Sequence, residues 1–147
     1  MHSDADSFFN GLYAREDVWP LLCNAHARRK YEAITKTSLK EGLAHEAMCF
    51  YSELYKIEKM AKAKNYSPEQ IKQTRQEQSV PILVKFKAWP EQKNLLVPPN
   101  APIAQAINYT LRHWEGLIRY CEDGRYSVTF PQQCLTWIMH GYRKLTF

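Results

Sequence analysis

The feature that most constrains the fold is a long apolar stripe in residues 39–64. The apolar residues recur alternately four and three positions apart, at Leu43, Ala47, Phe50, Leu54, Ile57 and Ala61. Because an α-helix has 3.6 residues per turn, this spacing places them on one continuous face, and Glu53 and Lys56 lie off it. A helix with such a stripe is expected to pack along another long helix.

Four more segments have helical patterns. Residues 4–17 place Phe8, Phe9, Leu12 and Tyr13 on one face, and residues 27–35 form a second short helix. A third helix begins at Ser67, which caps it, with Pro68 in the first turn. A last long helix is predicted over residues 102–123, after a Pro-rich loop at 95–102.

Two prolines interrupt the third helix. Pro81 is expected to kink or restart it, with Ser79 available as a new cap, and Pro90 is expected to end or bend it. Strands are predicted at residues 18–24, an apolar run of strand length, and at 125–130, where apolar and polar residues alternate.

Composition limits the class of protein. With 147 residues, 45% of them hydrophobic, the chain is long enough for one globular domain. No apolar run reaches the ~18 residues of a membrane span, and no signal peptide precedes the domain, so a cytoplasmic location is expected. Four widely separated cysteines are expected to be buried free thiols: Cys23, Cys49, Cys121 and Cys134. The net charge of +5 favours a polyanionic partner only weakly.

A basic cluster follows the first predicted strand, comprising His26, Arg28, Arg29 and Lys30. One interpretation makes the cations phosphate contacts that fix the path of DNA. The other makes the arginines an exposed helix face and His26 a packing or turn residue. The sequence leaves both open.

Two motifs carry a family resemblance. Residues 23–31 read Cys-Asn-Ala-His-Ala-Arg-Arg-Lys-Tyr, which resembles the Cys-Trp-Ala-His-Ala-Arg-Arg-Lys-Phe motif of the insertion-sequence-sixty-six transposases, a bacterial DDE family. Residues 106–125 match the family's Ala-Ile-x-Tyr-x-Leu-x-x-Trp-x-x-Leu-x-Arg-Tyr-x-Glu-Asp-Gly-Arg helix and turn. The resemblance extends over residues 4–130.

The resemblance implies an α/β fold. We expect an incomplete RNase H-like core with two or three short strands and a dominant all-helical insertion. Residues 1–147 would form a single partial transposase domain, with a core piece at 4–35, the insertion at 36–123, a core strand at 124–131 and a divergent tail at 132–147.

The resemblance also implies a catalytic chemistry. Three acidic residues of the family hold two Mg²⁺ or Mn²⁺ ions, which activate the nucleophile for cutting and joining DNA. Aligning residues 10–13 with the family motif places Asp4 on the second of these acids, as a catalytic residue and metal ligand. The first acid has no counterpart, and the third is expected in an Asn-Asn-x-x-Glu-Arg sequence, whereas residues 125–147 contain no Asp or Glu.

The expected function is therefore that of a truncated, catalytically inactive remnant of a DNA transposase, which binds no metal by itself. The alternative is a non-catalytic module that binds DNA phosphates or a transposase, with self-association as a further expectation and no membrane contact. We ascribe the divergence after Phe130 to a change of reading frame, a hypothesis that fails if the gene encodes no Asn-Asn-x-x-Glu in another frame.

Overall fold

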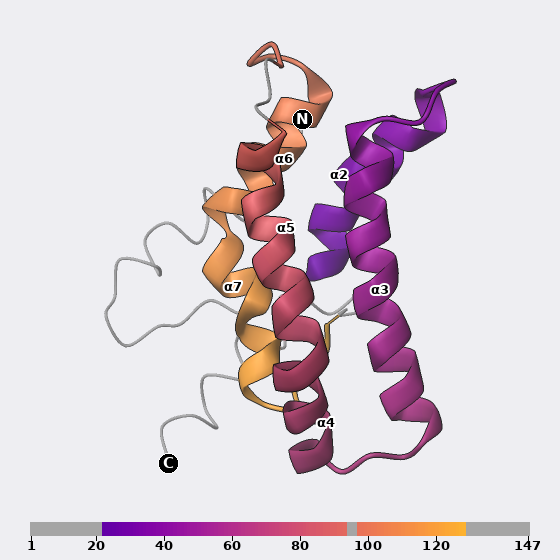
Figure 1. Ribbon diagram of the computed structural model, residues 1–147, viewed down its shortest axis with the longest axis vertical. Helices are drawn as coiled ribbons and strands as arrows, with labels where there is room; N and C mark the ends of the chain where they lie inside the picture. The colour runs from indigo at the N-terminus through magenta and orange to yellow at the C-terminus, as the bar shows by residue number, and fades with distance from the viewer. Residues whose placement is uncertain (1–21, 94–96, 129–147) are drawn as a thin grey trace.

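The computed structural model describes residues 22–93 and 97–128, and within these ranges every regular element is a helix. The elements are α2 (Asn24–Thr37), α3 (Leu43–Ala63), α4 (Pro68–Thr74), the π-helix η1 (Arg75–Ser79), α5 (Val80–Gln92), α6 (Pro102–Arg112), α7 (Trp114–Ile118) and the 3-10 helix η2 (Arg119–Glu122). Contacts join α2 to α3 and α6, α3 to α5, and η1 to η2, so the helices close a bundle (Figure 1).

The centre of the bundle is aromatic and is organised around Phe86 of α5. Its ring stacks on Phe50 of α3 with centroids 4.8 Å apart, and it meets Tyr51 and Trp114 edge-on at 5.3 and 5.8 Å. Offset and edge-to-face pairs of this kind are favourable beyond the area they bury. One ring from α5 therefore ties α3 to α7 across the core.

The long apolar stripe behaves as its spacing predicts. It forms α3, and Ala47, Leu54 and Ala61 on it are buried. Tyr51, which lies off the counted stripe, is also almost fully buried because α3 has neighbours on more than one side. The predicted partner helix is present as α5, which packs along α3.

The expected α/β fold is wrong for the part of the chain that the structure describes, because no strand or sheet occurs in residues 22–93 and 97–128. The strand expected at 18–24 reaches the described chain only at residues 22–24, where α2 has already begun at Asn24. A short continuous apolar run shows no helical or strand periodicity. It therefore cannot distinguish a strand from the residues that lead into a buried helix.

The second expected strand, at 125–130, is replaced by a turn in its described part. The Tyr126 amide donates to the Asp123 carbonyl at 3.1 Å, and the Tyr126 carbonyl accepts from the Arg75 side chain at 2.9 Å. Those backbone groups are therefore used by a turn and an arginine, and are not available to a neighbouring strand. Residues 129 and 130 lie outside the described ranges.

The helix from Pro68 to Gln92 continues through both prolines. The wider π-helical turn of η1 ends two residues before Pro81, whose ring would meet the carbonyl of residue 77 in a regular α-helix. Ser79 makes no capping hydrogen bond and is fully buried, so its predicted capping role is wrong. Pro90 lies inside α5, which runs on to Gln92.

The predicted last helix is divided at His113 into α6 and α7. This break allows α6 to pack on α2, while Trp114 at the start of α7 points to Phe86 of α5. In residues 22–93 and 97–128, no helix is long and apolar enough to cross a membrane.

The cysteines are only partly as expected. Cys23 and Cys121 are buried free thiols, but Cys49 is exposed, since it lies on the outer side of α3. Burial raises the pKa of the Cys121 thiol to about 11, which keeps it protonated at neutral pH. Cys134 lies outside the described residues.

Candidate nucleic-acid interface

The four basic-cluster residues all lie on α2 but point in different directions. Successive residues of an α-helix are rotated by about 100°, so neighbours in the sequence cannot share one face. His26 and Arg29, three positions apart, are exposed, whereas Arg28 and Lys30 are half-buried on either side. The structure thus separates the cluster into one outward-facing pair and two flanking cations.

Arg28 is directed toward α3. Its guanidinium carbon lies 5.7 Å from the ring centre of Tyr55, and its Nη1 is 3.4 Å from a carboxylate oxygen of Glu32. Burial raises the pKa of the Tyr55 hydroxyl to about 12, and the positive charge of Arg28 opposes this rise. Arg28 is therefore partly committed to contacts inside the fold.

Lys30 is directed to the opposite side, toward α6. Its ammonium group lies 4.4 Å from the ring centre of Tyr109, within the range of a cation–π contact. Glu32 pairs with Lys36 at 3.6 Å as well as with Arg28, so one carboxylate lies between two cations of α2. In the part of the chain that the structure describes, Arg29 has no carboxylate within ion-pair distance.

Two buried hydrogen bonds set the rotation of α2 about its axis. The Asn24 side-chain amide donates to the Leu117 carbonyl at 2.8 Å, and the Tyr31 hydroxyl lies 2.8 Å from the Thr110 hydroxyl. Burial raises the pKa of Tyr31 to about 12, so this hydroxyl stays a neutral hydrogen-bonding group. With the start of α2 fixed on α7 and its middle fixed on α6, His26 and Arg29 are held on the outside.

The outward face of α2 is suited to bind phosphate. A guanidinium offers planar paired donors that match phosphate oxygens, and it keeps its charge at any physiological pH. His26, one turn before Arg29, adds a second polar group on the same exposed face. Contacts of this kind position a protein on nucleic acid without reading its sequence.

A second arrangement was not predicted from the sequence and centres on Arg75 of η1, which is 2% exposed. Its guanidinium donates to both carboxylate oxygens of Glu58, at 2.8 and 2.7 Å. It also donates to three backbone carbonyls, those of Tyr120 at 2.6 Å, Asp123 at 2.9 Å and Tyr126 at 2.9 Å. The sequence shows only that Arg75 lies within a predicted helix and that such a helix must bury one of its faces.

These contacts hold the Glu-Asp-Gly-Arg turn of the second motif. The Asp123 carboxylate accepts from the Arg125 amide at 2.8 Å and pairs with its guanidinium, which lowers the pKa of Asp123. A side-chain carbon added at Gly124 would lie 1.9 Å from the Pro68 carbonyl oxygen. The glycine is therefore required because the turn packs directly on the start of α4.

The predicted catalytic acid and metal ligand, Asp4, lies outside the described residues. Within residues 22–93 and 97–128, no three His, Cys, Asp or Glu side chains are grouped as a metal site requires.

Comparison with known proteins accounts for the two motifs. The family model described as "Transposase IS66 family" matches residues 1–130. Two relatives from Sinorhizobium fredii (strain NBRC 101917 / NGR234) are similar. "Uncharacterized protein y4hP" is 28% identical over 139 residues, and "Uncharacterized protein y4jD" is 35% identical over 108 residues.

These alignments cover 86% and 73% of this chain but only 25% and 20% of the two relatives, so the chain spans about a quarter of their length or less. No solved structure matches. The family model covers most of the chain, including both motifs and the turn held by Arg75. The chain therefore belongs to the IS66 transposase family.

Proposed function

We propose that this chain is a transposase-derived domain that binds the phosphate backbone of DNA through the outward face of α2 and does not cut DNA by itself. The observation that carries the proposal is the position of Arg29 and His26. Both are exposed on one side of a helix whose rotation is fixed by buried hydrogen bonds on its other side.

Family membership supports a role connected with transposition, in which DNA is the partner. The net charge of +5 points in the same direction, since a positively charged protein attracts a polyanion at long range. Arg28 and Lys30 lie on either side of the exposed α2 face and add positive charge beside it. The Arg28 guanidinium also contacts the Tyr55 ring, and the Lys30 ammonium group contacts the Tyr109 ring. Contact with phosphates alone would make the binding independent of DNA sequence.

The part of the proposal that concerns cutting is supported by the number of carboxylates that the chemistry needs. The two-metal mechanism of DDE transposases needs several carboxylates to hold Mg²⁺ or Mn²⁺. Asp4 is the one family acid that the sequence matches, and residues 125–147 contain no acidic residue to serve as the third. A single carboxylate does not organise a pair of divalent ions.

Binding is tested by fluorescence anisotropy of a labelled duplex of about 20 base pairs, titrated with the full chain at several salt concentrations. Phosphate contacts release counterions, so affinity should fall steeply as salt rises. Arg29→Ala should weaken the binding, whereas Lys59→Ala on the outside of α3 is the matched control and should not. Affinity that is equal in Arg29→Ala and the wild type would contradict the proposal.

Cutting is tested separately by incubating supercoiled plasmid with the full chain and Mg²⁺ or Mn²⁺. The proposal expects no nicking above the rate of buffer alone. Metal-dependent nicking that disappears in Asp4→Ala would show that the chain is catalytic and would overturn this half of the proposal while leaving the DNA-binding half intact.

A further inference from the structure

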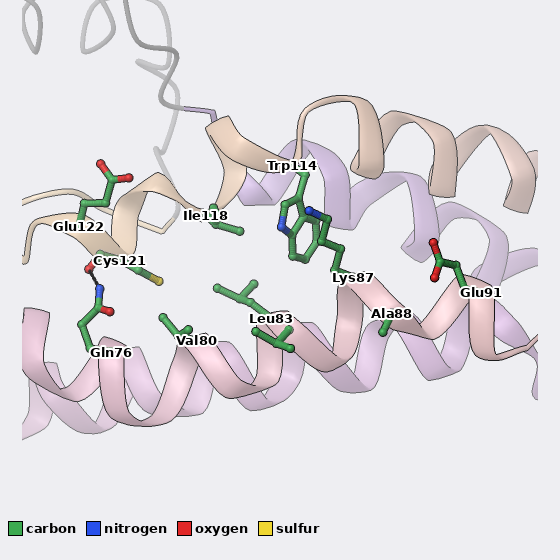
Figure 2. Close-up of a pocket in the computed structure, with 11 residues that line it drawn as sticks. Gln76, Val80, Leu83, Lys87, Ala88, Glu91, Trp114, Ile118, Cys121 and Glu122 are labelled. Carbon is green, nitrogen blue, oxygen red and sulfur yellow. Dashed lines mark hydrogen bonds between the residues drawn. The ribbon is translucent and has the colours of Figure 1, made fainter.

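An apolar groove runs along α5 on the side that faces α7 and η2 (Figure 2). It has a volume of about 670 Å³, and the Gln76 side-chain amide bridges one end by donating to the Cys121 carbonyl at 2.8 Å. Of the residues that line it, Leu83, Trp114 and Cys121 are buried, whereas Val84 is 63% exposed. Exposed apolar surface that is gathered in a groove marks an interaction site.

One wall of the groove is a row of short side chains on α5. Val80, Val84 and Ala88 recur every four positions, so they lie along one ridge of the helix and allow another helix to approach closely. The groove from Gln76 to Glu91 covers 15 residues of helix, a length of about 22 Å. This shape fits an amphipathic helix of about four turns, whose apolar residues recur three and four positions apart.

Charged side chains lie at both ends of the groove. Glu122 lies near Gln76 at one end and Glu91 lies at the other, with Lys87 one turn before Glu91 on α5 (Figure 2). Lys87 and Glu91 are exposed, and within residues 22–93 and 97–128 neither forms an ion pair. Glu122 is exposed as well and lies 3.7 Å from Arg119. A helix with basic residues at both ends complements these carboxylates.

The same charges disfavour a second copy of this chain as the occupant. If two copies paired through the groove with their α5 helices antiparallel, Glu91 of each would lie against Glu122 of the other. If the two helices were parallel, each charged residue would lie against its own counterpart. Like charges meet in either arrangement and oppose the pairing. The groove is therefore complementary to a different polypeptide.

The relatives indicate which polypeptide contains additional sequence. This chain aligns with only 25% of y4hP and 20% of y4jD, so three quarters or more of each relative lies outside the aligned stretch. In a protein of that length, the groove lies in one molecule with all of this further sequence, which is available to cover it.

We propose that the α5 groove binds an amphipathic helix of a full-length IS66-family transposase, about four turns long and with basic residues at both ends. The domain then associates with a transposase through a surface that shares no residue with the DNA-binding face of α2. This association does not depend on the proposed binding of DNA.

Overlapping 20-residue peptides that cover y4jD outside the aligned stretch test the proposal. The fluorescently labelled full chain is applied to them without DNA, and affinities are then measured by fluorescence anisotropy. At least one group of overlapping peptides with an apolar stripe and basic ends should bind. Val84→Asp should weaken this binding by about tenfold, because it places a charge against the apolar face. Leu39→Asp, at an exposed residue outside the groove, is the matched control and should bind as the wild type does.

An exchange of charges distinguishes the groove from non-specific apolar association. The peptide that binds best is made again with the basic residues of one end, or of the other end, replaced by Glu. Each replacement should weaken binding to the wild type by about threefold, as expected for exposed ion pairs. Glu91→Lys should restore the binding of one of these peptides, and Glu122→Lys that of the other. Glu53→Lys, on the exposed side of α3, is the control and should restore neither.

Val84, Glu91 and Glu122 are exposed, so their substitution does not disturb the core, and an unchanged helical circular dichroism spectrum verifies this. The proposal is overturned if no peptide distinguishes the wild type from Val84→Asp, or if neither charge exchange restores binding. Sedimentation velocity that shows a dimer of the wild type and a monomer of Val84→Asp would also overturn it, because a second copy would then occupy the groove. None of these outcomes bears on the binding of DNA, which is tested with Arg29→Ala.

Discussion

Arg75 and Glu58 form a bidentate ion pair that joins η1 to α3, with Nε to Oε1 at 2.8 Å and Nη2 to Oε2 at 2.7 Å. The Arg75 side chain is 3% exposed and that of Glu58 is 19% exposed. The remaining guanidinium donors reach the carbonyls of residues 120, 123 and 126. One arginine therefore joins the middle of the bundle to the turn at its end.

Replacing Arg75 by Met should destabilise the fold strongly. The change leaves the Glu58 carboxylate and three backbone carbonyls without their donor, and removing one partner of a buried pair costs about 3–5 kcal/mol. Arg75→Lys should restore little of this loss, since a single ammonium group cannot replace a five-donor fork. Urea denaturation followed by circular dichroism measures the free energy of unfolding.

The matched control for Arg75 is Arg125→Met. Arg125 also pairs with a carboxylate, that of Asp123, but it is exposed, and exposed ion pairs contribute little. A free energy of unfolding that falls equally in both variants, or that does not fall in Arg75→Met, would contradict the central role given to Arg75.

Gly124→Ala should also destabilise the chain, by about 2–3 kcal/mol, as overpacking does in a well-packed region. The added carbon would lie 1.9 Å from the Pro68 carbonyl oxygen, so the turn or the start of α4 must move. Gly42→Ala is the control, because nothing lies within 4 Å of a side-chain carbon at that position. Thermal unfolding of the two variants side by side checks this, and equal melting temperatures would be inconsistent with it.

The Glu46 carboxylate should make stability depend on pH. It accepts a hydrogen bond from the Trp89 indole at 2.8 Å and pairs with Lys93 at 3.1 Å, and these contacts lower the pKa of Glu46 below its ordinary value of 4.5. A carboxyl group whose pKa is lower in the folded state stabilises the fold above its unfolded pKa. That contribution is lost as the pH falls through the folded pKa.

The free energy of unfolding, measured from pH 7 down to pH 3, should therefore fall less in Glu46→Gln than in the wild type. Trp89→Phe keeps an aromatic ring but removes the principal donor, so it should flatten the profile in the same direction. Identical slopes in Glu46→Gln and the wild type would show that the contact between α3 and α5 does not depend on the charge.

The sequence predicted the helices better than it predicted the class of fold. The stripe from Leu43 to Ala61 has a long, regular period, and it formed the expected helix packed on another helix. The two strand predictions depended on runs of six or seven residues. Such runs are too short for the spacing of apolar residues to distinguish a strand from other structures. The described part of both runs is taken by the start of α2 and by the turn that Arg75 holds.

The sequence predicted which basic residues form the candidate interface, but not the directions in which their side chains point. The basic cluster was evident, yet only the position of α2 among its neighbours shows that Arg28 faces Tyr55, Lys30 faces Tyr109 and Arg29 faces outward. The role of Arg75 was not predictable, because its partners lie 17 to 51 positions away in the sequence. Asp4 remains a prediction outside the described residues.

The most direct test of the account is the salt dependence of DNA affinity in the wild type and in Arg29→Ala. Each phosphate contact contributes about 0.9 to the slope of log affinity against log salt concentration, so Arg29→Ala should lower that slope by about one. Lys59→Ala should leave it unchanged. A wild-type affinity that does not respond to salt, or a slope that Lys59→Ala lowers as much as Arg29→Ala, would contradict a DNA-binding face on α2.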